Sequence, residues 1–252
     1  MKNLTFYKEF KQELLEIDYL FHNYLNSWWE DIYNYTYTLE EDLLWQSIPE
    51  FVLLAYDYFG VEEDLSIKMA VIFKMVYLSN HIHAHIKDDK EGQAYNQELQ
   101  FTILIGDYLF GQIMKLLLEV GAVKVVDAFT DMMGEISEGY IIKNKIDASA
   151  IEVLEKTEAN YYSTAFFTAA RLSGITSERD LILIKELGLS LGMIMYLILN
   201  NRTHNEINDY MLKINQLYNL VNHNKGNDKS FLPKAIIKLN EFLGNQSKAA
   251  VI

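Results

Sequence analysis

Hydrophobic positions recur at helical spacing along most of the chain. Within residues 4–30 they share one broad face, as expected of an amphipathic helix that packs on a core: Leu14, Ile17, Leu20, Phe21 and Leu25. The same spacing predicts helices over residues 39–59, 64–86, 96–121, 122–142, 149–172, 178–199 and 205–222, with a short last helix after Pro233. The pattern therefore predicts an all-α fold of about nine to ten helices joined by short loops.

Local signals indicate where several of these helices begin and end. A glycine follows three of them and is expected to end the helix in a left-handed turn: Gly60, Gly121 and Gly174. Ser149, with Glu152 three residues later, forms a capping box that predicts a helix start. Because proline inside a helix removes a hydrogen bond, we interpret Ile48-Pro49 as another start.

Composition favours a single helical domain. Half of the 252 residues are hydrophobic, enough for a sizeable core. Since no linker or shift in composition interrupts the chain, residues 1–252 are predicted to form one domain, with a frayed tail after Gly244. The chain has no cysteine, which excludes disulfides and thiolate metal sites and agrees with a reducing cytoplasm.

Charge and hydropathy argue against two classes of partner. The net charge is −13 and arginine is scarce, whereas a protein that binds nucleic acid must neutralise phosphates with Lys and Arg. The charged, amphipathic N-terminus is not that of a signal peptide. The longest apolar run, residues 187–199, is too short to span a bilayer, so we interpret it as a buried helix. We expect a cytoplasmic protein with no transmembrane segment.

Candidate chemistry gathers at the end of the helix predicted over residues 64–86. His81 and His85 are four residues apart and share a helical face, with Asp88 one turn further on, so this set could bind Zn²⁺ or another divalent cation. The alternative is that the histidines interact only with the helix dipole and that Asp88 lies in a solvated loop. Asp107 falls within an apolar stretch, where a buried carboxylate is expected to need a structural partner.

Five fragments of the sequence occur in an order that resembles the polyprenyl diphosphate synthase family, the trans-isoprenoid synthases. They are Ile48-Pro49 with the apolar helix after it, LQFTILIGDYLFGQ at 99–112, EISEGY at 135–140, Lys156-Thr157, and LGLSLGMIMYLILN at 187–200. The resemblance covers most of the chain and implies the isoprenoid synthase fold, a single bundle of helices. It also implies that Lys156 and Thr157 contact a diphosphate.

The catalytic motifs of that family are missing from this chain. Its first Asp-rich motif aligns with Ala84, His85, Ile86, Lys87 and Asp88, and its second with Met195, Tyr196, Leu197, Ile198 and Leu199. Its Gly-Lys-Arg, which binds isopentenyl diphosphate, is replaced by Leu44-Trp45-Gln46-Ser47. Mg²⁺ on a leaving diphosphate needs carboxylate ligands, and Met, Tyr and Leu supply none. We therefore expect no catalytic residue and no bound cofactor in this chain.

The resemblance is closest to the small subunits, called component I, of heterodimeric heptaprenyl and hexaprenyl diphosphate synthases. It implies a non-catalytic regulatory subunit that pairs with a catalytic large subunit, the holder of Mg²⁺. Such a subunit helps set the length of the isoprenoid chain used for quinones such as menaquinone. One alternative is a divergent prenyltransferase or terpene synthase that uses His81, His85, Asp88 and Asp107 in a non-standard site. A second is a stand-alone helical protein that binds an isoprenoid or another lipid.

By the same resemblance, the helix around residues 103–118 belongs to the subunit interface. Its apolar positions exceed the single stripe that a helix needs for its own core. The predicted interface residues are Leu109, Phe110, Ile113, Met114 and Leu117. The alternative is a fully internal helix.

Overall fold

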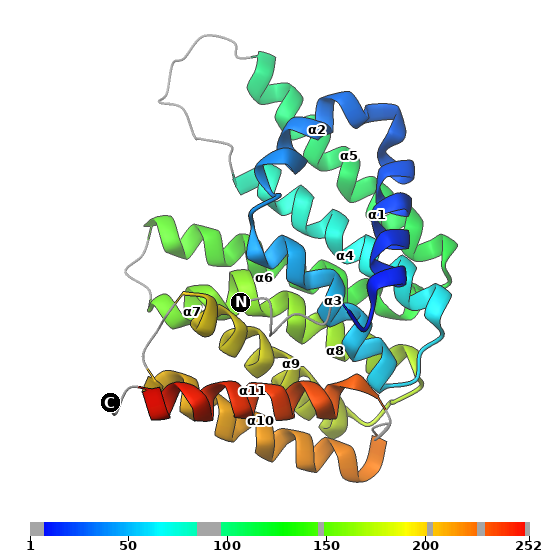
Figure 1. Ribbon diagram of the computed structural model, residues 1–252. Coiled ribbons are helices and arrows are strands. Elements are labelled where there is room, and N and C mark those ends of the chain that lie inside the picture. The colour runs from blue at the N-terminus through cyan, green and yellow to red at the C-terminus, as the bar shows by residue number, and fades with distance from the viewer. Residues whose placement is uncertain (1–7, 85–96, 146–148, 201–203, 226–229, 250–252) are drawn as a thin grey trace.

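The computed structural model describes residues 8–84, 97–145, 149–200, 204–225 and 230–249, and within these ranges every regular element is a helix. Figure 1 shows α1 (Lys11–Leu25), α2 (Trp29–Thr38), α3 (Leu43–Tyr58), α4 (Glu63–Ala84), α5 (Gln97–Glu119), α6 (Val126–Lys145), α7 (Ala150–Leu154), α8 (Asn160–Leu172), α9 (Glu178–Leu199), α10 (His204–Lys225) and α11 (Phe231–Ala249). A π-helical stretch, Glu155–Ala159, joins α7 to α8. The prediction of an all-α fold is confirmed.

Two predicted helix boundaries differ from the structure. Pro49 does not start a helix but lies inside α3, because Asp42 caps that helix seven residues earlier and accepts hydrogen bonds from two backbone N–H groups of its first turn, at 2.8 and 3.0 Å. The last helix is not short: α11 continues past Gly244 to Ala249.

The predicted helix ends are otherwise found where the local signals place them. Gly60, Gly121 and Gly174 have φ angles of 68°, 73° and 99°, which a residue with a Cβ rarely adopts. The hydroxyl of Ser149 accepts a hydrogen bond from the N–H of Glu152 at 3.1 Å, as one half of the predicted capping box.

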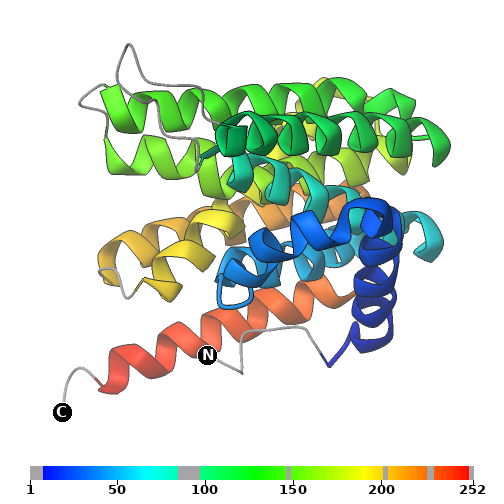
Figure 2. The same ribbon diagram turned by 90° about the horizontal axis from the view of Figure 1, so that it is seen from above.

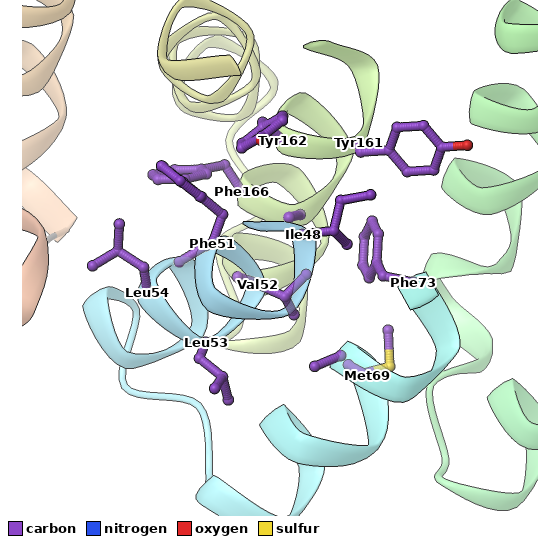
Figure 3. Packing of buried hydrophobic residues seen from close by; sticks show 14 of the residues in the cluster. Ile48, Phe51, Val52, Leu53, Leu54, Met69, Phe73, Tyr161, Tyr162 and Phe166 are labelled. Atoms are coloured by element: carbon purple, nitrogen blue, oxygen red, sulfur yellow. The ribbon is translucent and has the colours of Figure 1, made fainter. Parts of the chain in front are cut away.

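The core is built around α3, which packs against α4 on one side and α8 on the other. Phe51 of α3 meets the ring of Tyr162 of α8 edge to face, with 4.7 Å between ring centroids. Figure 3 shows Val52 of α3 on the side of Met69 and Phe73 of α4, and all of these side chains are buried. The core thus lies among α3, α4, α8 and α9, and helices at the edge of the bundle cover it.

Helices α8 and α9 approach each other closely because α9 has glycines at the contact. A Cβ built on Gly188 would lie 2.6 Å from the carbonyl oxygen of Tyr162 and 3.0 Å from Cα of Ser163. One built on Gly192, a turn later, would lie 2.7 Å from the ring of Tyr162. No larger residue fits at either position unless the two backbones separate.

Two described helices are long and apolar enough, by length and composition alone, to cross a membrane: residues Leu99–Glu119 in α5 and Glu178–Ile198 in α9. The apolar run 187–199, too short by itself to span a bilayer, forms the second half of α9, a helix of 22 residues. Of the most apolar window in α9, 61% is buried in the bundle, as in the core helix of a soluble protein. In α5 only 33% is buried.

Figure 1 explains the exposure of α5, because it shows this helix at one edge of the bundle, with α10 and α11 at the opposite edge. In Figure 2 α11 again lies on the far side of the bundle from α5. Helix α5 packs mainly against α4. It therefore presents a large apolar surface to the outside.

Candidate functional site

The first degenerate motif region lies at the end of α4. Ala84 is the last residue of that helix, and His85 and Asp88 lie outside the described residues. The ring of His81 stacks on Tyr77, with 6.4 Å between centroids, and its Nε2 is 3.4 Å from Oγ1 of Thr38 in α2. Among the described residues no three His, Asp or Glu side chains are placed to hold a metal ion. The metal site predicted at His81, His85 and Asp88 stays a prediction, because His85 and Asp88 lie outside the described residues.

His83 and Asp107 connect α4 to α5. Nε2 of His83 is 3.7 Å from Oδ1 of Asp107. The Asp107 side chain is 67% exposed, so the expectation of a buried carboxylate is wrong. The imidazole reaches it across Gly106, where a Cβ would collide with the ring of His83. Because α5 lies at the edge of the bundle, Asp107 faces outward despite its apolar neighbours in sequence.

We predict that Asp107→Asn changes stability little. A histidine–carboxylate contact this exposed contributes at most about 1 kcal/mol, and the change in melting temperature should stay within about 3 °C. Asp18→Asn is the matched comparison, because Asp18 pairs with Lys74 at 2.5 Å and the Lys74 side chain is only 11% exposed. Thermal unfolding followed by circular dichroism should show the larger loss for Asp18→Asn. The opposite order would contradict the exposed position of Asp107.

The second degenerate motif region forms the C-terminal part of α9. Met195 is buried in the core, Tyr196 is half-buried, and Leu199 is the last residue of the helix. This part of α9 therefore presents hydrocarbon and one phenol where the resembling family has carboxylates.

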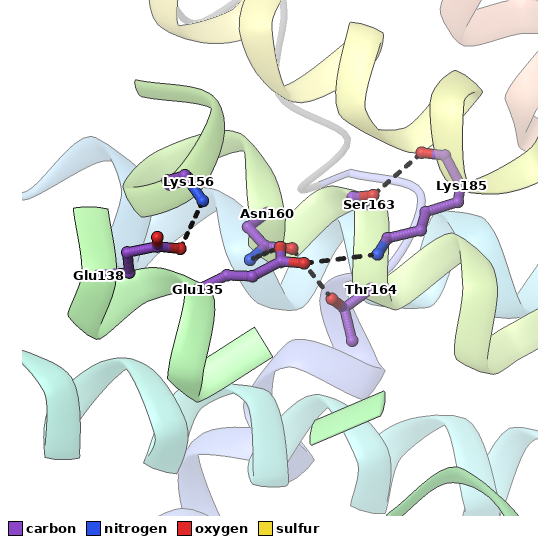
Figure 4. A network of polar contacts seen from close by, with 7 residues as sticks. All are labelled: Glu135, Glu138, Lys156, Asn160, Ser163, Thr164 and Lys185. Atoms are coloured by element: carbon purple, nitrogen blue, oxygen red, sulfur yellow. Dashed lines mark hydrogen bonds and ion pairs between the residues drawn. The ribbon is translucent and has the colours of Figure 1, made fainter. Parts of the chain in front are cut away.

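Lys156 and Thr157, the predicted diphosphate contacts, lie in the π-helical stretch. Nζ of Lys156 pairs with Oε2 of Glu138 at 2.7 Å, and this hydrogen bond raises the pKa of Lys156 (Figure 4). The hydroxyl of Thr157 donates to the carbonyl of Val153 in its own helix at 2.8 Å. Both groups already have partners within the chain. Whether they also contact a diphosphate stays a prediction.

The five predicted interface residues of α5 divide into two sets. Leu109, Ile113 and Leu117 are fully buried in the chain's own core, so they are not available to a partner. Phe110 is 39% exposed and Met114 is half-buried. Further large apolar side chains of α5 are exposed by more than a third: Phe101, Ile103, Leu104 and Leu118. We call these four residues and Phe110 the exposed α5 residues.

A cavity of about 330 Å³ lies between the start of α3, α4, the π-helical stretch and α9. Its lining consists of Glu41, Asp42, Leu43, Leu44, Tyr77, Glu158, Tyr162, Gly192, Tyr196 and Asn200. Three carboxyl groups and three tyrosine side chains are thus present. No Lys, Arg or His belongs to this lining, as far as the described residues show.

Both carboxylate oxygens of Asp42 already accept hydrogen bonds from within the chain. Oδ1 accepts from the two N–H groups at the start of α3, and Oδ2 accepts from the hydroxyl of Tyr77 at 2.8 Å. Burial, then the negative charge of Asp42, raises the pKa of Tyr77 well above its usual range, so the phenol stays protonated and donates. The hydroxyl of Tyr162 is likewise hydrogen-bonded, to Oγ of Ser47 at 2.7 Å.

Glu158 is a second carboxyl group of this cavity and, unlike Asp42, is half-buried without such hydrogen bonds. Burial, and next the negative charge of Asp42, raise the pKa of Glu158 to about 7, and the positive charge of Lys143 opposes them. Within the described part of the chain no hydrogen bond or ion pair to its carboxylate is found. Carboxylates bind a diphosphate only through a metal ion, and among the described residues no three acidic or histidine side chains are placed to hold one, so by charge alone this cavity disfavours a diphosphate.

Sequence reasoning missed both Asp42 and Glu158. Asp42 precedes an apolar helical run and is a helix-capping residue type, so this signal was present. Glu158 is the last of three glutamates at three-residue spacing, after Glu152 and Glu155, and only its burial distinguishes it from the other two.

Comparison with known proteins supports the resemblance seen in the sequence. No model of a protein family matches the chain. A curated prenyl transferase from Porphyra purpurea is 25% identical over 121 residues, which cover 45% of this chain and 38% of that protein. The match thus spans less than half the length of this relative.

Solved structures match over nearly the whole chain. A polyprenyl synthase from Caulobacter crescentus CB15, complexed with calcium and isoprenyl diphosphate, superimposes with a TM-score of 0.73 at 14% identity, over 96% of this chain and 97% of that one. The chain has the isoprenoid synthase fold. A geranyl diphosphate synthase small subunit from Antirrhinum majus gives a TM-score of 0.56 at 13% identity, over 89% of this chain and 98% of that one. Within this fold, the described lining of the cavity therefore includes three acidic side chains and no Lys, Arg or His.

Proposed function

We propose that this chain is a non-catalytic regulatory subunit of a heterodimeric polyprenyl diphosphate synthase. The proposal rests on one observation: within the isoprenoid synthase fold, the cavity is lined by three carboxyl groups and no cationic side chain of the described residues. A diphosphate substrate needs cations or metal-bound carboxylates around it. Tyr196 and the buried Met195 supply neither.

Two further observations favour a partner subunit over an enzyme that acts alone. The exposed α5 residues form a large apolar surface, of the kind that marks protein interaction sites. One structural neighbour is itself named a small subunit of a geranyl diphosphate synthase. In the proposed complex the large subunit holds Mg²⁺ and performs the chemistry, while this chain adds an apolar wall that accommodates the growing isoprenoid tail. The proposed product is the side chain of a quinone such as menaquinone, made in the cytoplasm by a heptaprenyl-type synthase.

The test is prenyl transfer by the chain alone and in its complex. Purified protein incubated with farnesyl diphosphate, isopentenyl diphosphate and Mg²⁺ should show less than about 1% of the turnover of a competent synthase, since loss of catalytic groups typically lowers rates by more than 100-fold. Co-expression with a large subunit that has both Asp-rich motifs should give a complex with full activity and a longer product. Turnover by the lone chain, or a large subunit indifferent to its presence, would contradict the proposal.

A further inference from the structure

Among the carboxyl groups that line the cavity, Glu41 is exposed to water, whereas Glu158 is half-buried and has no hydrogen bond or ion pair within the described residues. Asp42 is held by three hydrogen bonds, and the hydroxyls of Tyr77 and Tyr162 have partners. Glu158 also lines the cavity, with none of these contacts. A partly buried carboxylate without a partner lowers the stability of the fold. A positively charged ligand that pairs with Glu158 would offset this cost.

The backbone places Glu158 in the cavity through the π-helical stretch Glu155–Ala159. A π-bulge inserts one residue into a helix and turns the following side chains by about 100°, and such bulges are frequent at functional sites. The stretch is held in place from outside by the Lys156–Glu138 pair at 2.7 Å. It packs against α9 and α6. The position of Glu158 is therefore built into the fold.

The rest of the lining indicates which ligand fits. Tyrosine rings attract cations through their π-electrons, and rings beside a carboxylate are the usual surroundings of a bound ammonium group. Tyr77, Tyr162 and Tyr196 line the cavity together with Glu158, and Leu43 and Leu44 offer an apolar surface to the remainder of a ligand. Its volume of about 330 Å³ is that of a small-ligand pocket. A phosphate in the same place would be repelled by the three carboxyl groups of the lining.

We propose that this cavity binds an alkylammonium ligand, with Glu158 as the counter-ion and the three tyrosine side chains as walls around the cationic group. This proposal shares the acidic lining of the cavity with the proposed function but does not need a synthase subunit, because every residue of the site belongs to this chain. The ligand class is opposite in charge to a diphosphate.

The proposal carries a pH dependence. Glu158 is half ionised near pH 7, and an ammonium ligand binds the ionised form. Affinity should therefore rise as the pH increases from 6 to 8, by about tenfold for one group with this pKa. Two negatively charged groups, Glu41 and Asp42, and one positively charged group, Lys143 of α6, face Glu158. Four tyrosine hydroxyls also face it, and their raised pKa values keep them protonated between pH 6 and 8: Tyr77, Tyr140, Tyr161 and Tyr162.

Calorimetric titration of the full chain with three ligands of equal tail length tests the head group: hexylammonium, 1-hexanol and hexyl phosphate. At pH 8 we expect hexylammonium to bind at least tenfold more tightly than hexanol, and hexyl phosphate to bind more weakly than either. Tighter binding of hexyl phosphate, or equal binding of hexylammonium and hexanol, would overturn the proposal.

Glu158→Gln is the decisive variant, because it keeps the shape of the side chain and removes its charge. It should bind hexylammonium only as well as hexanol, without the pH dependence, and leave hexanol binding unchanged. Glu152→Gln, an exposed position on the same continuous helix, should behave as wild type. If circular dichroism shows that Glu158→Gln is unfolded, the wild-type pH profile decides: affinity for hexylammonium that is flat between pH 6 and 8 contradicts the proposal. No partner subunit enters these assays. Equal binding of hexylammonium and hexanol, or a flat pH profile, would therefore leave the proposed function untouched, whereas tighter binding of hexyl phosphate would count against both proposals.

Discussion

Phe110→Glu is expected to leave a folded chain that no longer pairs with a catalytic synthase subunit. Phe110 is 39% exposed, so a carboxylate there reaches water in the lone subunit and should not disturb its core. At an interface the same carboxylate would be buried without a partner. Hot-spot substitutions cost about 2 kcal/mol or more, which is roughly a 30-fold loss of affinity. Analytical size exclusion with the large subunit should show two separate species in place of one complex.

Leu212→Glu provides the matched control for this experiment. Leu212 is a large exposed apolar residue, 62% exposed, on α10 at the opposite edge of the bundle from α5 (Figure 1). It should leave the complex intact. Pairing and prenyl transfer that survive Phe110→Glu would exclude this surface of α5 as the interface. A Phe110→Glu chain that fails to fold would instead mean that α5 is an internal helix, which its exposure argues against.

Gly188→Ala is expected to lower the melting temperature by several degrees, although alanine is the better helix former. The added Cβ would lie 2.6 Å from the carbonyl oxygen of Tyr162, and a backbone atom cannot move aside as a side chain can. Overpacking of this kind costs about 1–3 kcal/mol, and for a chain of this size each kcal/mol corresponds to roughly 2–4 °C. Thermal unfolding followed by circular dichroism measures the shift.

Gly134→Ala makes the same chemical change in an open position. Gly134 lies inside α6 with no atom within 4 Å of a built Cβ, so alanine should stabilise the chain by up to about 1 kcal/mol through helix propensity alone. The two variants should therefore shift the melting temperature in opposite directions. A Gly188→Ala chain as stable as wild type would mean that α8 and α9 do not pack as closely as the structure has them.

Exposure and pairing of polar groups were the features that the sequence predicted least well. Asp107 lies in an apolar stretch and was expected to be buried, yet α5 is at the edge of the bundle and its side chain is 67% exposed. Of the five residues predicted for an interface, three point into the chain's own core. An excess of hydrophobic residues on a helix predicts that a second face is also in contact with something. It does not predict which of these residues face the chain's own core and which face outward.

What the sequence determined by itself is local. Helical periodicity, the glycine stops and the Ser149 cap depend on residues within a few positions of one another, because the α-helix is closed by hydrogen bonds between residues four apart. The missing acids at Met195 and Tyr196 are likewise visible without any structure. What only the tertiary structure decided is the meeting of distant groups. Asp42 and Glu158 belong to different helices, and their common cavity and mutual repulsion arise only when α3 and the π-helical stretch pack together.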